Sequence, residues 1–167
     1  MYATVTQLIK MLANLDRWLE EAEATAKDRD FDVDRLLHAR LSMDMFSFDR
    51  QVQSACDTAK FVGSRLTGGE APSHPDTEKT LAELRERVRS TREYLQSLDE
   101  AAFEGAEDRK LFLPFLKGGY VTGEAYVREF AIPNFYFHAT TAYALLRHHG
   151  VKLGKMTFIG GMDVRQP

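Results

Sequence analysis

The residues best suited to chemistry are the histidines near the end of the chain. Three of the five histidines, His138, His148 and His149, fall in the stretch 134–150, which has the composition of a helix. An imidazole can bind a metal, move a proton or serve as a hydrogen-bond partner from a buried position. The first question is therefore whether His138 is a metal ligand or a member of a buried polar network.

Helical spacing predicts where His138 points. Asn134 and His138 are four residues apart, so they share one face of a helix, and that face continues to Leu145. Because Leu145 is apolar, we expect this face to lie between helices. A buried imidazole without a partner costs about 1–3 kcal/mol, so His138 needs either hydrogen-bond partners or a metal.

The other two histidines have a structural interpretation. His148 and His149 stand directly before Gly150, where donor side chains suit the free carbonyl groups of a helix end and glycine accepts the left-handed conformation. We expect them to cap the helix. The same helix also carries aromatic residues on all sides, so it must be covered all round, either by the hairpin and the tail of the chain or by a second subunit. Of these two we expect a homodimer. These aromatic residues are Phe135, Tyr136, Phe137 and Tyr143.

Composition narrows the class of protein. The chain has 167 residues, 44% of them hydrophobic and 28% charged, which predicts one folded domain over residues 1–167. A net charge of −3 without a basic stripe gives no reason to expect nucleic acid. The one cysteine, Cys56, excludes an intramolecular disulfide and a cysteine-based zinc cage, and it is expected to be buried.

No targeting or membrane segment is expected. The first residues lack a basic start and a continuous apolar run, and no segment approaches the roughly 18 uninterrupted apolar residues of a membrane span. We therefore predict a cytoplasmic protein with no membrane partner.

The apolar pattern predicts an all-α fold. Steps of three and four between apolar residues predict four helices, over residues 4–26, 47–66 (capped by Ser47), 75–98 and 134–150. Such helices favour a four-helix bundle. A long first connection follows the first helix, with a short helical turn over residues 33–40.

The helical spacing of apolar residues is interrupted before the last helix. The pair Gly118-Gly119 between short apolar runs predicts a small β-hairpin, with Pro114 confining its strand to an edge. Gly123 marks the return to helix, and Pro133 predicts a kink or brief break.

A family resemblance covers nearly the whole chain. The final helix, with its Leu145-Leu146-Arg147 and Gly150, resembles that of the DinB/YfiT-like superfamily of helical-bundle metalloenzymes. Within it, the chain resembles one uncharacterised bacterial DUF family. The segments that carry this closer resemblance are "RLSMDMFSFDRQVQSACDTAK", "FEGAEDR", "IPNFYFHATTAYALLRHHGVKLGK" and "FIGG". The resemblance implies a four-helix bundle, and that family has no established activity.

The resemblance also implies where a metal would bind. Metal-binding members typically use one histidine on the second helix and two on the fourth, and several use the metal to activate a low-molecular-weight thiol. In this sequence only His138 matches, because the first histidine of the fourth-helix pair falls on Asn134 and the second helix has none. Amides are weak ligands for first-row metals. The second-helix polar candidates for a partner of His138 are Gln51, Gln53 and Asp57.

Two functions remain open from the sequence. The first, favoured by the ligand count, is a bundle with a degenerate metal site that binds a small molecule near His138 and Asn134 or acts mainly as a dimer, with no cofactor expected. The alternative is a metal-dependent thiol-cofactor transferase or isomerase, with zinc or nickel on His138. In that case His38 or Asp44 from the first connection would complete the site.

Overall fold

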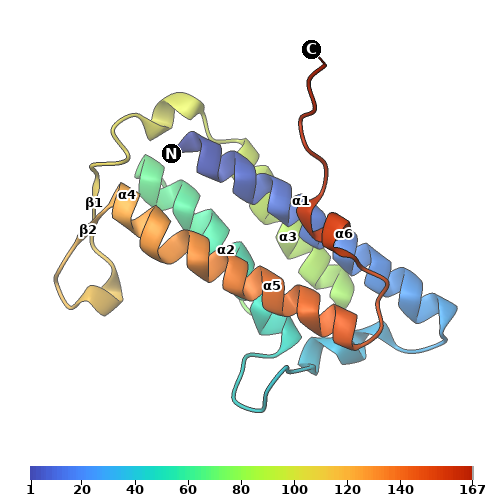
Figure 1. Cartoon of the computed structure of the whole chain (residues 1–167). Coiled ribbons are helices and arrows are strands. Elements are labelled where there is room, and N and C mark those ends of the chain that lie inside the picture. The colour runs from blue at the N-terminus through green and yellow to red at the C-terminus, as the bar shows by residue number, and fades with distance from the viewer. Residues whose placement is uncertain (167) are drawn as a thin grey trace.

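Four long helices form the body of the computed structural model, which describes residues 1–166. They lie roughly along one direction, with α2 beside α5 (Figure 1). This arrangement confirms the predicted four-helix bundle. The long helices are α1 (Tyr2–Asp28), α2 (Phe48–Thr67), α3 (Leu81–Gln96) and α5 (Ile132–His148).

Short elements fill the connections. The predicted turn in the long first connection is the 3-10 helix η1 (Val33–His38). None of the helices in residues 1–166 has both the length and the apolar composition needed to cross a bilayer. The other short elements are η2 (Glu100–Phe103), β1 (Lys110–Leu111), η3 (Pro114–Leu116), β2 (Val121–Thr122), α4 (Gly123–Ala125), η4 (Tyr126–Ala131) and α6 (Lys155–Ile159).

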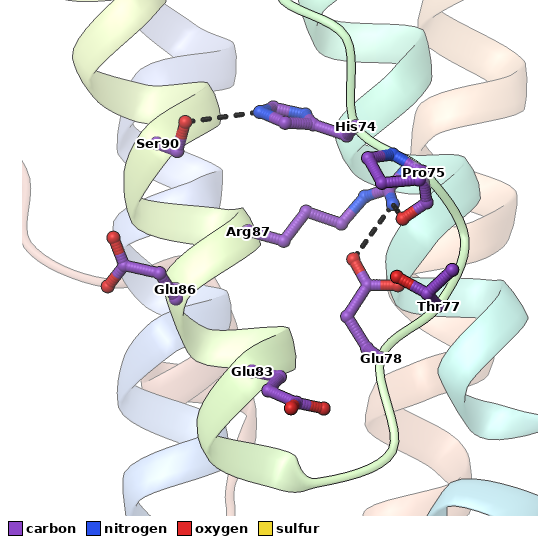
Figure 2. Close-up of a pocket in the computed structure, with 8 residues that line it drawn as sticks. All are labelled: His74, Pro75, Thr77, Glu78, Glu83, Glu86, Arg87 and Ser90. Atoms are coloured by element: carbon purple, nitrogen blue, oxygen red, sulfur yellow. Dashed lines mark hydrogen bonds and ion pairs between the residues drawn. The ribbon is translucent and has the colours of Figure 1, made fainter.

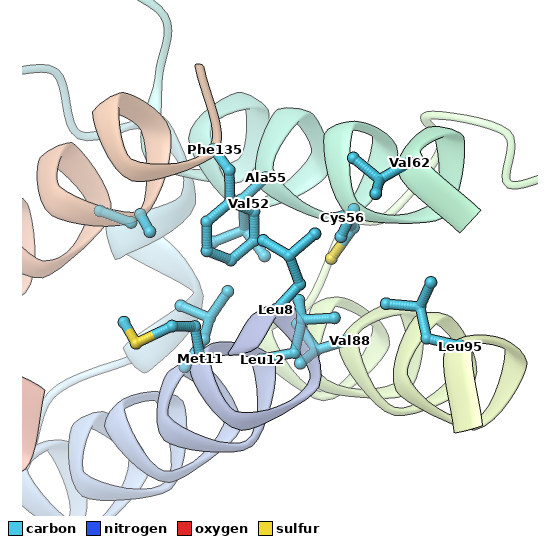
Figure 3. Close-up of a cluster of buried hydrophobic side chains, with 14 of the residues drawn as sticks. Leu8, Met11, Leu12, Val52, Ala55, Cys56, Val62, Val88, Leu95 and Phe135 are labelled. Atoms are coloured by element: carbon cyan, nitrogen blue, oxygen red, sulfur yellow. The ribbon is translucent and has the colours of Figure 1, made fainter. Parts of the chain in front are cut away.

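The core lies where the apolar stripes of the long helices meet. Leu8 and Leu12 of α1 point toward Val52 of α2, Val88 of α3 and Phe135 of α5 (Figure 3), and all five side chains are buried. Each such side chain contributes roughly 1.5–3 kcal/mol by leaving water. The three-and-four spacing in the sequence therefore predicted the buried faces correctly.

Helix α3 begins later than the sequence pattern predicted. Thr80 accepts a hydrogen bond from the Glu83 backbone N–H, and the Glu83 carboxylate accepts one from the Thr80 N–H, which completes a capping box before Leu81. The predicted start at residue 75 is wrong. Asp76 and Glu78 precede the helix and bind the side chain of Arg87 instead of the helix dipole.

The predicted hairpin is present but small. Strands β1 and β2 are antiparallel, with Lys110 opposite Thr122. Pro114 begins the 3-10 helix η3 inside the long hairpin loop, so its assignment to an edge strand is wrong. The loop carries Phe115 and Tyr120 on its surface.

The segment before α5 is continuous helix of mixed type. Gly123 returns the chain to helix, and a Cβ atom at this position would lie 1.9 Å from the Ala106 carbonyl oxygen, so only glycine fits. A π-helix, η4, then leads into α5, with Pro133 in the first turn of α5. The predicted irregularity at Pro133 is thus a π-helical segment just before it. Such segments frequently occur at functional sites.

Helix α6 covers the aromatic residues of α1 and α5. The Trp18 indole N–H donates to the Thr157 carbonyl oxygen over 3.0 Å, and the Asn14 amide donates to that of Phe158 over 3.0 Å. The Trp18 and Phe158 rings stack with centroids 5.1 Å apart, and Tyr143 meets Trp18 edge-on. The sequence pattern did not predict this helix.

Candidate functional site: a pocket between α2 and α5

His138 is hydrogen-bonded to α2 in the interior of the bundle. Its Nδ1 lies 2.7 Å from Gln51 Oε1, and the Gln51 amide nitrogen donates to the Phe46 carbonyl oxygen over 3.1 Å. Because that amide nitrogen is already donating, Gln51 presents its oxygen to the ring, and Nδ1 carries the proton. Nε2 therefore keeps its lone pair, and the one hydrogen bond of the ring within residues 1–166 is that of Nδ1.

Aromatic rings hold the imidazole in place. The Phe46 ring stacks on His138 with centroids 6.3 Å apart, and Phe137 meets it edge-on at 5.2 Å. Burial lowers the pKa of His138 from its ordinary value of 6.5, so the ring is neutral at pH 7. The site thus offers a neutral nitrogen that can accept a hydrogen bond.

Asn134 bonds a second residue of α2. Its amide nitrogen donates to Thr58 Oγ1 over 2.7 Å, while the Thr58 hydroxyl donates to the Ser54 carbonyl oxygen over 2.7 Å. The bond to Thr58 is the one side-chain hydrogen bond of Asn134 among the described residues, so its Oδ1 has no partner there. Thr58 was not predicted, because a threonine that bonds the carbonyl one turn earlier resembles any other helical threonine. Its position two turns after Gln51 is the signal that could have found it.

Gln53 and Asp57, the other two α2 residues predicted as partners of His138, do not bond it. The structure places Gln53 outside this pocket, with its amide nitrogen 2.8 Å from Glu78 Oε2. Asp57 lines the pocket, but its Oδ1 accepts from Arg87 Nη2 at 2.7 Å and from Lys60 Nζ at 2.8 Å. Of the three candidates, Gln51 is the residue that bonds His138.

Arg87 connects this region to a hollow on the α3 side. Its side chain extends from α3 to Glu78 and the Pro75 carbonyl group, below His74, whose ring bonds Ser90 (Figure 2). His74 is half-buried. The hollow has a volume of about 370 Å³. Arg87 is paired there with Glu78, while His74 Nδ1 and Arg87 Nε are buried without a hydrogen-bond partner among the described residues.

The pocket between α2 and α5 has a volume of about 230 Å³. Polar groups from α2 and α5 form one end, and Arg65 with Tyr126 forms the other. Aromatic rings from α2, the hairpin loop and η4 lie between. The lining residues are Ser54, Asp57, Thr58, Phe61, Arg65, Phe115, Tyr126, Phe130, Asn134 and His138.

The remaining sequence candidates lie elsewhere. His38 and Asp44 are exposed and do not line the pocket, so neither completes a site at His138. His149 Nδ1 lies 2.8 Å from the Leu145 carbonyl oxygen, which confirms its capping role, whereas His148 is exposed and bonds no carbonyl group among the described residues.

Cys56 is buried in the core between helices, as expected. Burial raises the pKa of its thiol to about 12, so it remains protonated at neutral pH. Because the thiolate is the reactive form, Cys56 is not a nucleophile in this structure.

The residues of the pocket do not fit the three-histidine metal site. Residues 1–166 contain no group of three or more His, Cys, Asp or Glu side chains that could hold a metal. The pocket offers one imidazole nitrogen, an amide oxygen, three hydroxyl groups and the carboxylate of Asp57, which is already paired. Such a donor set binds zinc far more weakly than three imidazoles.

Comparison with known proteins identifies the family. A family model described as a domain of unknown function, DUF1993, matches residues 1–159. The chain belongs to the DUF1993 family. It is also similar to a DinB family member protein from Shewanella denitrificans, with 48% identity and a TM-score of 0.93 over 98% of this chain and 93% of that crystal structure's chain. Among curated proteins, none matches this chain.

These matches confirm the resemblance seen in the sequence. This DUF1993 chain is a DinB-like protein of a family whose function is not assigned. The site must therefore be interpreted from its own geometry.

The state of His138 predicts how stability depends on pH. The pKa of the folded-state ring lies below its ordinary value of 6.5, so the unfolded chain takes up this proton first as pH falls. The contribution of His138 to stability therefore decreases as pH drops below 6.5, and it levels off below the folded-state pKa. An NMR titration of the imidazole should give a midpoint under 6.5.

A variant separates His138 from other titrating groups. In His138→Gln, the free energy of unfolding should fall less steeply between pH 7 and pH 5 than in the wild type. A His138 midpoint at or above 6.5 would mean that the ring is not held neutral by burial.

Proposed function

We propose that this DUF1993 protein is a metal-free, small-molecule-binding bundle whose ligand occupies the pocket between α2 and α5. One observation carries this proposal: Gln51 fixes the proton of His138 on Nδ1, which leaves Nε2 as an unpaired acceptor at the pocket. In a metalloenzyme, such a second-helix partner would orient the imidazole toward its metal. Here the partner orients the same nitrogen toward a space without the other metal ligands.

The neighbouring residues support binding. Pockets that recognise small molecules combine apolar walls with a few fixed polar groups. The Asn134–Thr58 hydrogen bond ties α5 to α2 beside His138, so the polar groups are positioned before any ligand arrives. Preorganisation of this kind lowers the entropic cost of binding.

Metal analysis of protein purified without a histidine tag tests the proposal. We expect less than about one tenth of an equivalent of zinc, nickel or iron after dialysis, because one imidazole with an amide and a hydroxyl holds these ions weakly. The matched variant His138→Ala should contain the same trace amount. Stoichiometric metal that is lost in His138→Ala would overturn the proposal and favour a metal-dependent thiol transferase or isomerase.

We also propose that two copies of the chain associate through the outer face of α5. Phe137 is 56% exposed on this face, and Phe130 of η4, about two turns earlier, is 38% exposed. Ile132, which is 36% exposed, lies instead toward α1, beside Thr4 and Gln7. Grouped large apolar side chains on a surface mark interaction sites. The single cysteine favours a reducing, cytoplasmic setting for such an assembly.

Light scattering tests the association. The wild type should have about twice the mass of one chain, and Phe137→Glu should have the mass of one chain, because a charge replaces an apolar contact. Met43→Glu, at a side chain that is 96% exposed in the first connection, serves as the control and should leave the mass unchanged. A wild type that is monomeric at high micromolar concentration would rule out the dimer.

A further inference from the structure

The two ends of the pocket between α2 and α5 have opposite hydrogen-bonding character. At one end His138 Nε2 and Asn134 Oδ1 are acceptors without partners among the described residues, and Asp57, whose carboxylate is paired with Arg87 and Lys60, also lines the pocket. At the other end the charged group is the guanidinium of Arg65. A ligand that satisfies both ends must present a donor to the first and an acceptor, preferably an anion, to the second.

Arg65 differs from the other buried or half-buried cations near it. Arg87 and Lys60 each form an ion pair with Asp57, whereas Arg65 forms no ion pair within residues 1–166. Its Nη1 donates to the Tyr126 hydroxyl oxygen over 2.9 Å. Nε and Nη2 have no acceptor among the described residues, so the guanidinium of Arg65, which lines the pocket, keeps N–H donors free.

The guanidinium is also fixed in direction. It lies over the Phe61 ring at 4.7 Å and over the Tyr126 ring at 5.2 Å, and Tyr126 is 1% exposed. An arginine held between two rings keeps its planar set of donors in one orientation. That planar geometry matches the two oxygens of a carboxylate.

The π-helix η4 brings the aromatic wall into place. It carries Tyr126 and Phe130, whose rings stack with centroids 6.0 Å apart, and Phe115 from the hairpin loop packs on Phe130 at 5.2 Å. Phe130 stands four residues from both Tyr126 and Asn134, so its ring lies between the two polar ends of the pocket. The middle of the pocket therefore suits a flat, apolar group.

The length of the ligand follows from helix geometry. Thr58, which bonds Asn134, and Arg65 stand two turns apart on α2, which is roughly 10 Å along the helix axis. We propose that the pocket takes an elongated carboxylate, with the carboxylate on Arg65, an aromatic or similarly flat body along Phe130, and a hydroxyl or amino donor on Asn134 Oδ1, next to His138. This inference rests on the proposed small-molecule-binding function and specifies its ligand class.

A matched set of probes tests the ligand class. The probes are 4-hydroxyphenyl alkanoates with one to three methylene groups between ring and carboxylate, together with their neutral primary amides. Binding is followed by NMR, from the shifts of the His138 ring signals as each probe is added. The dependence of these shifts on probe concentration gives the Kd. We expect at least one carboxylate to bind about tenfold or more tightly than its amide, with the preference weakening as salt rises.

Variants assign the preference to Arg65. Arg65→Met should remove the preference while leaving the affinity for the amide within about twofold, and Arg65→Lys should restore part of it. Arg128→Met, on the exposed side of η4, should bind both probes as the wild type does. Circular dichroism of each variant checks that the bundle remains folded.

The outcomes distinguish the two proposals. If carboxylate and amide bind equally, or if Arg65→Met keeps the preference, the ligand class is wrong but the binding function stands. If neither series moves the His138 signals at millimolar concentration, the ligand class and the proposed binding function both fail. Arg65→Lys binding no better than Arg65→Met would also count against a role for the positive charge.

Discussion

Histidines placed at positions 58 and 134 are expected to convert the pocket into a zinc site. The double variant Thr58→His with Asn134→His should bind one Zn²⁺ per chain, with an affinity on the order of a thousandfold above that of the wild type. Asn134 Nδ2 and Thr58 Oγ1 are 2.7 Å apart, so larger side chains at these positions would meet in the same space. His138, one turn from Asn134 on α5, would supply the third nitrogen.

The wild-type residues explain why the change should be large. Gln51 already holds the His138 ring with Nε2 unpaired, so one ligand is oriented in advance. The two substitutions replace an amide and a hydroxyl, both poor zinc ligands, with imidazoles. Isothermal titration with Zn²⁺, supported by metal analysis after dialysis, measures the gain.

Controls separate a built site from zinc that binds elsewhere. The triple variant Thr58→His, Asn134→His and His138→Ala should lose at least half of the gained binding energy, because two imidazoles remain. His148→Ala in the double variant should change nothing, since His148 lies at the exposed end of α5. A double variant that binds no more zinc than the wild type would show that α2 and α5 do not bring these positions together.

The bundle was predictable from the sequence because its cause is local. The three-and-four spacing of residues such as Leu8 and Leu12 determines which face of each helix is buried, and those faces form the core. The start of α3 was not predictable in this way. Asp76 and Glu78 suit the first turn of a helix, but the carboxylates instead bind Arg87, and the Asp34 carboxylate accepts from the Leu81 backbone N–H across a long span of chain.

The site was predicted only in part for the same reason. His138 and Asn134 follow from spacing within one helix, whereas their partners depend on the rotation of α2 against α5. If the predicted rotation of α2 is wrong by one residue, a neighbour of Gln51 is predicted to face His138 in its place. The amino-acid sequence of the π-helix η4 does not distinguish it from an α-helix. The inward positions of Tyr126 and Phe130 could therefore not be inferred from the spacing of apolar residues.

Arg87 is expected to be the charged residue with the largest effect on stability. Its side chain is 2% exposed, and it donates to Asp57 over 2.7 Å and to Glu78 over 2.9 Å. It also forms an ion pair with Asp76 at 3.1 Å. These acids come from α2 and from the segment that precedes α3, so one guanidinium joins three parts of the chain. Removing one member of a buried ion network leaves charges without partners, which typically costs about 3–5 kcal/mol.

We therefore expect Arg87→Met to lower the free energy of unfolding by about 3 kcal/mol, near the lower end of that range because Asp57 and Asp76 retain contact with water. Urea denaturation, with the slope of the transition compared between variants, measures the loss. Arg128→Met is the matched control. The ion pair of Arg128 with Glu129 is exposed, so its removal should change stability by less than about 0.5 kcal/mol.

A second substitution identifies the origin of the loss. If carboxylates left without Arg87 cause the loss, the double variant Arg87→Met, Glu78→Gln should be more stable than Arg87→Met alone. Glutamine removes one buried negative charge and has the same shape as the glutamate that it replaces. If lost packing of the arginine stem causes it, the second substitution should add its own penalty instead. A loss below about 1 kcal/mol in Arg87→Met would show that the bundle does not depend on this network, and that Asp57 keeps its position beside the pocket without it.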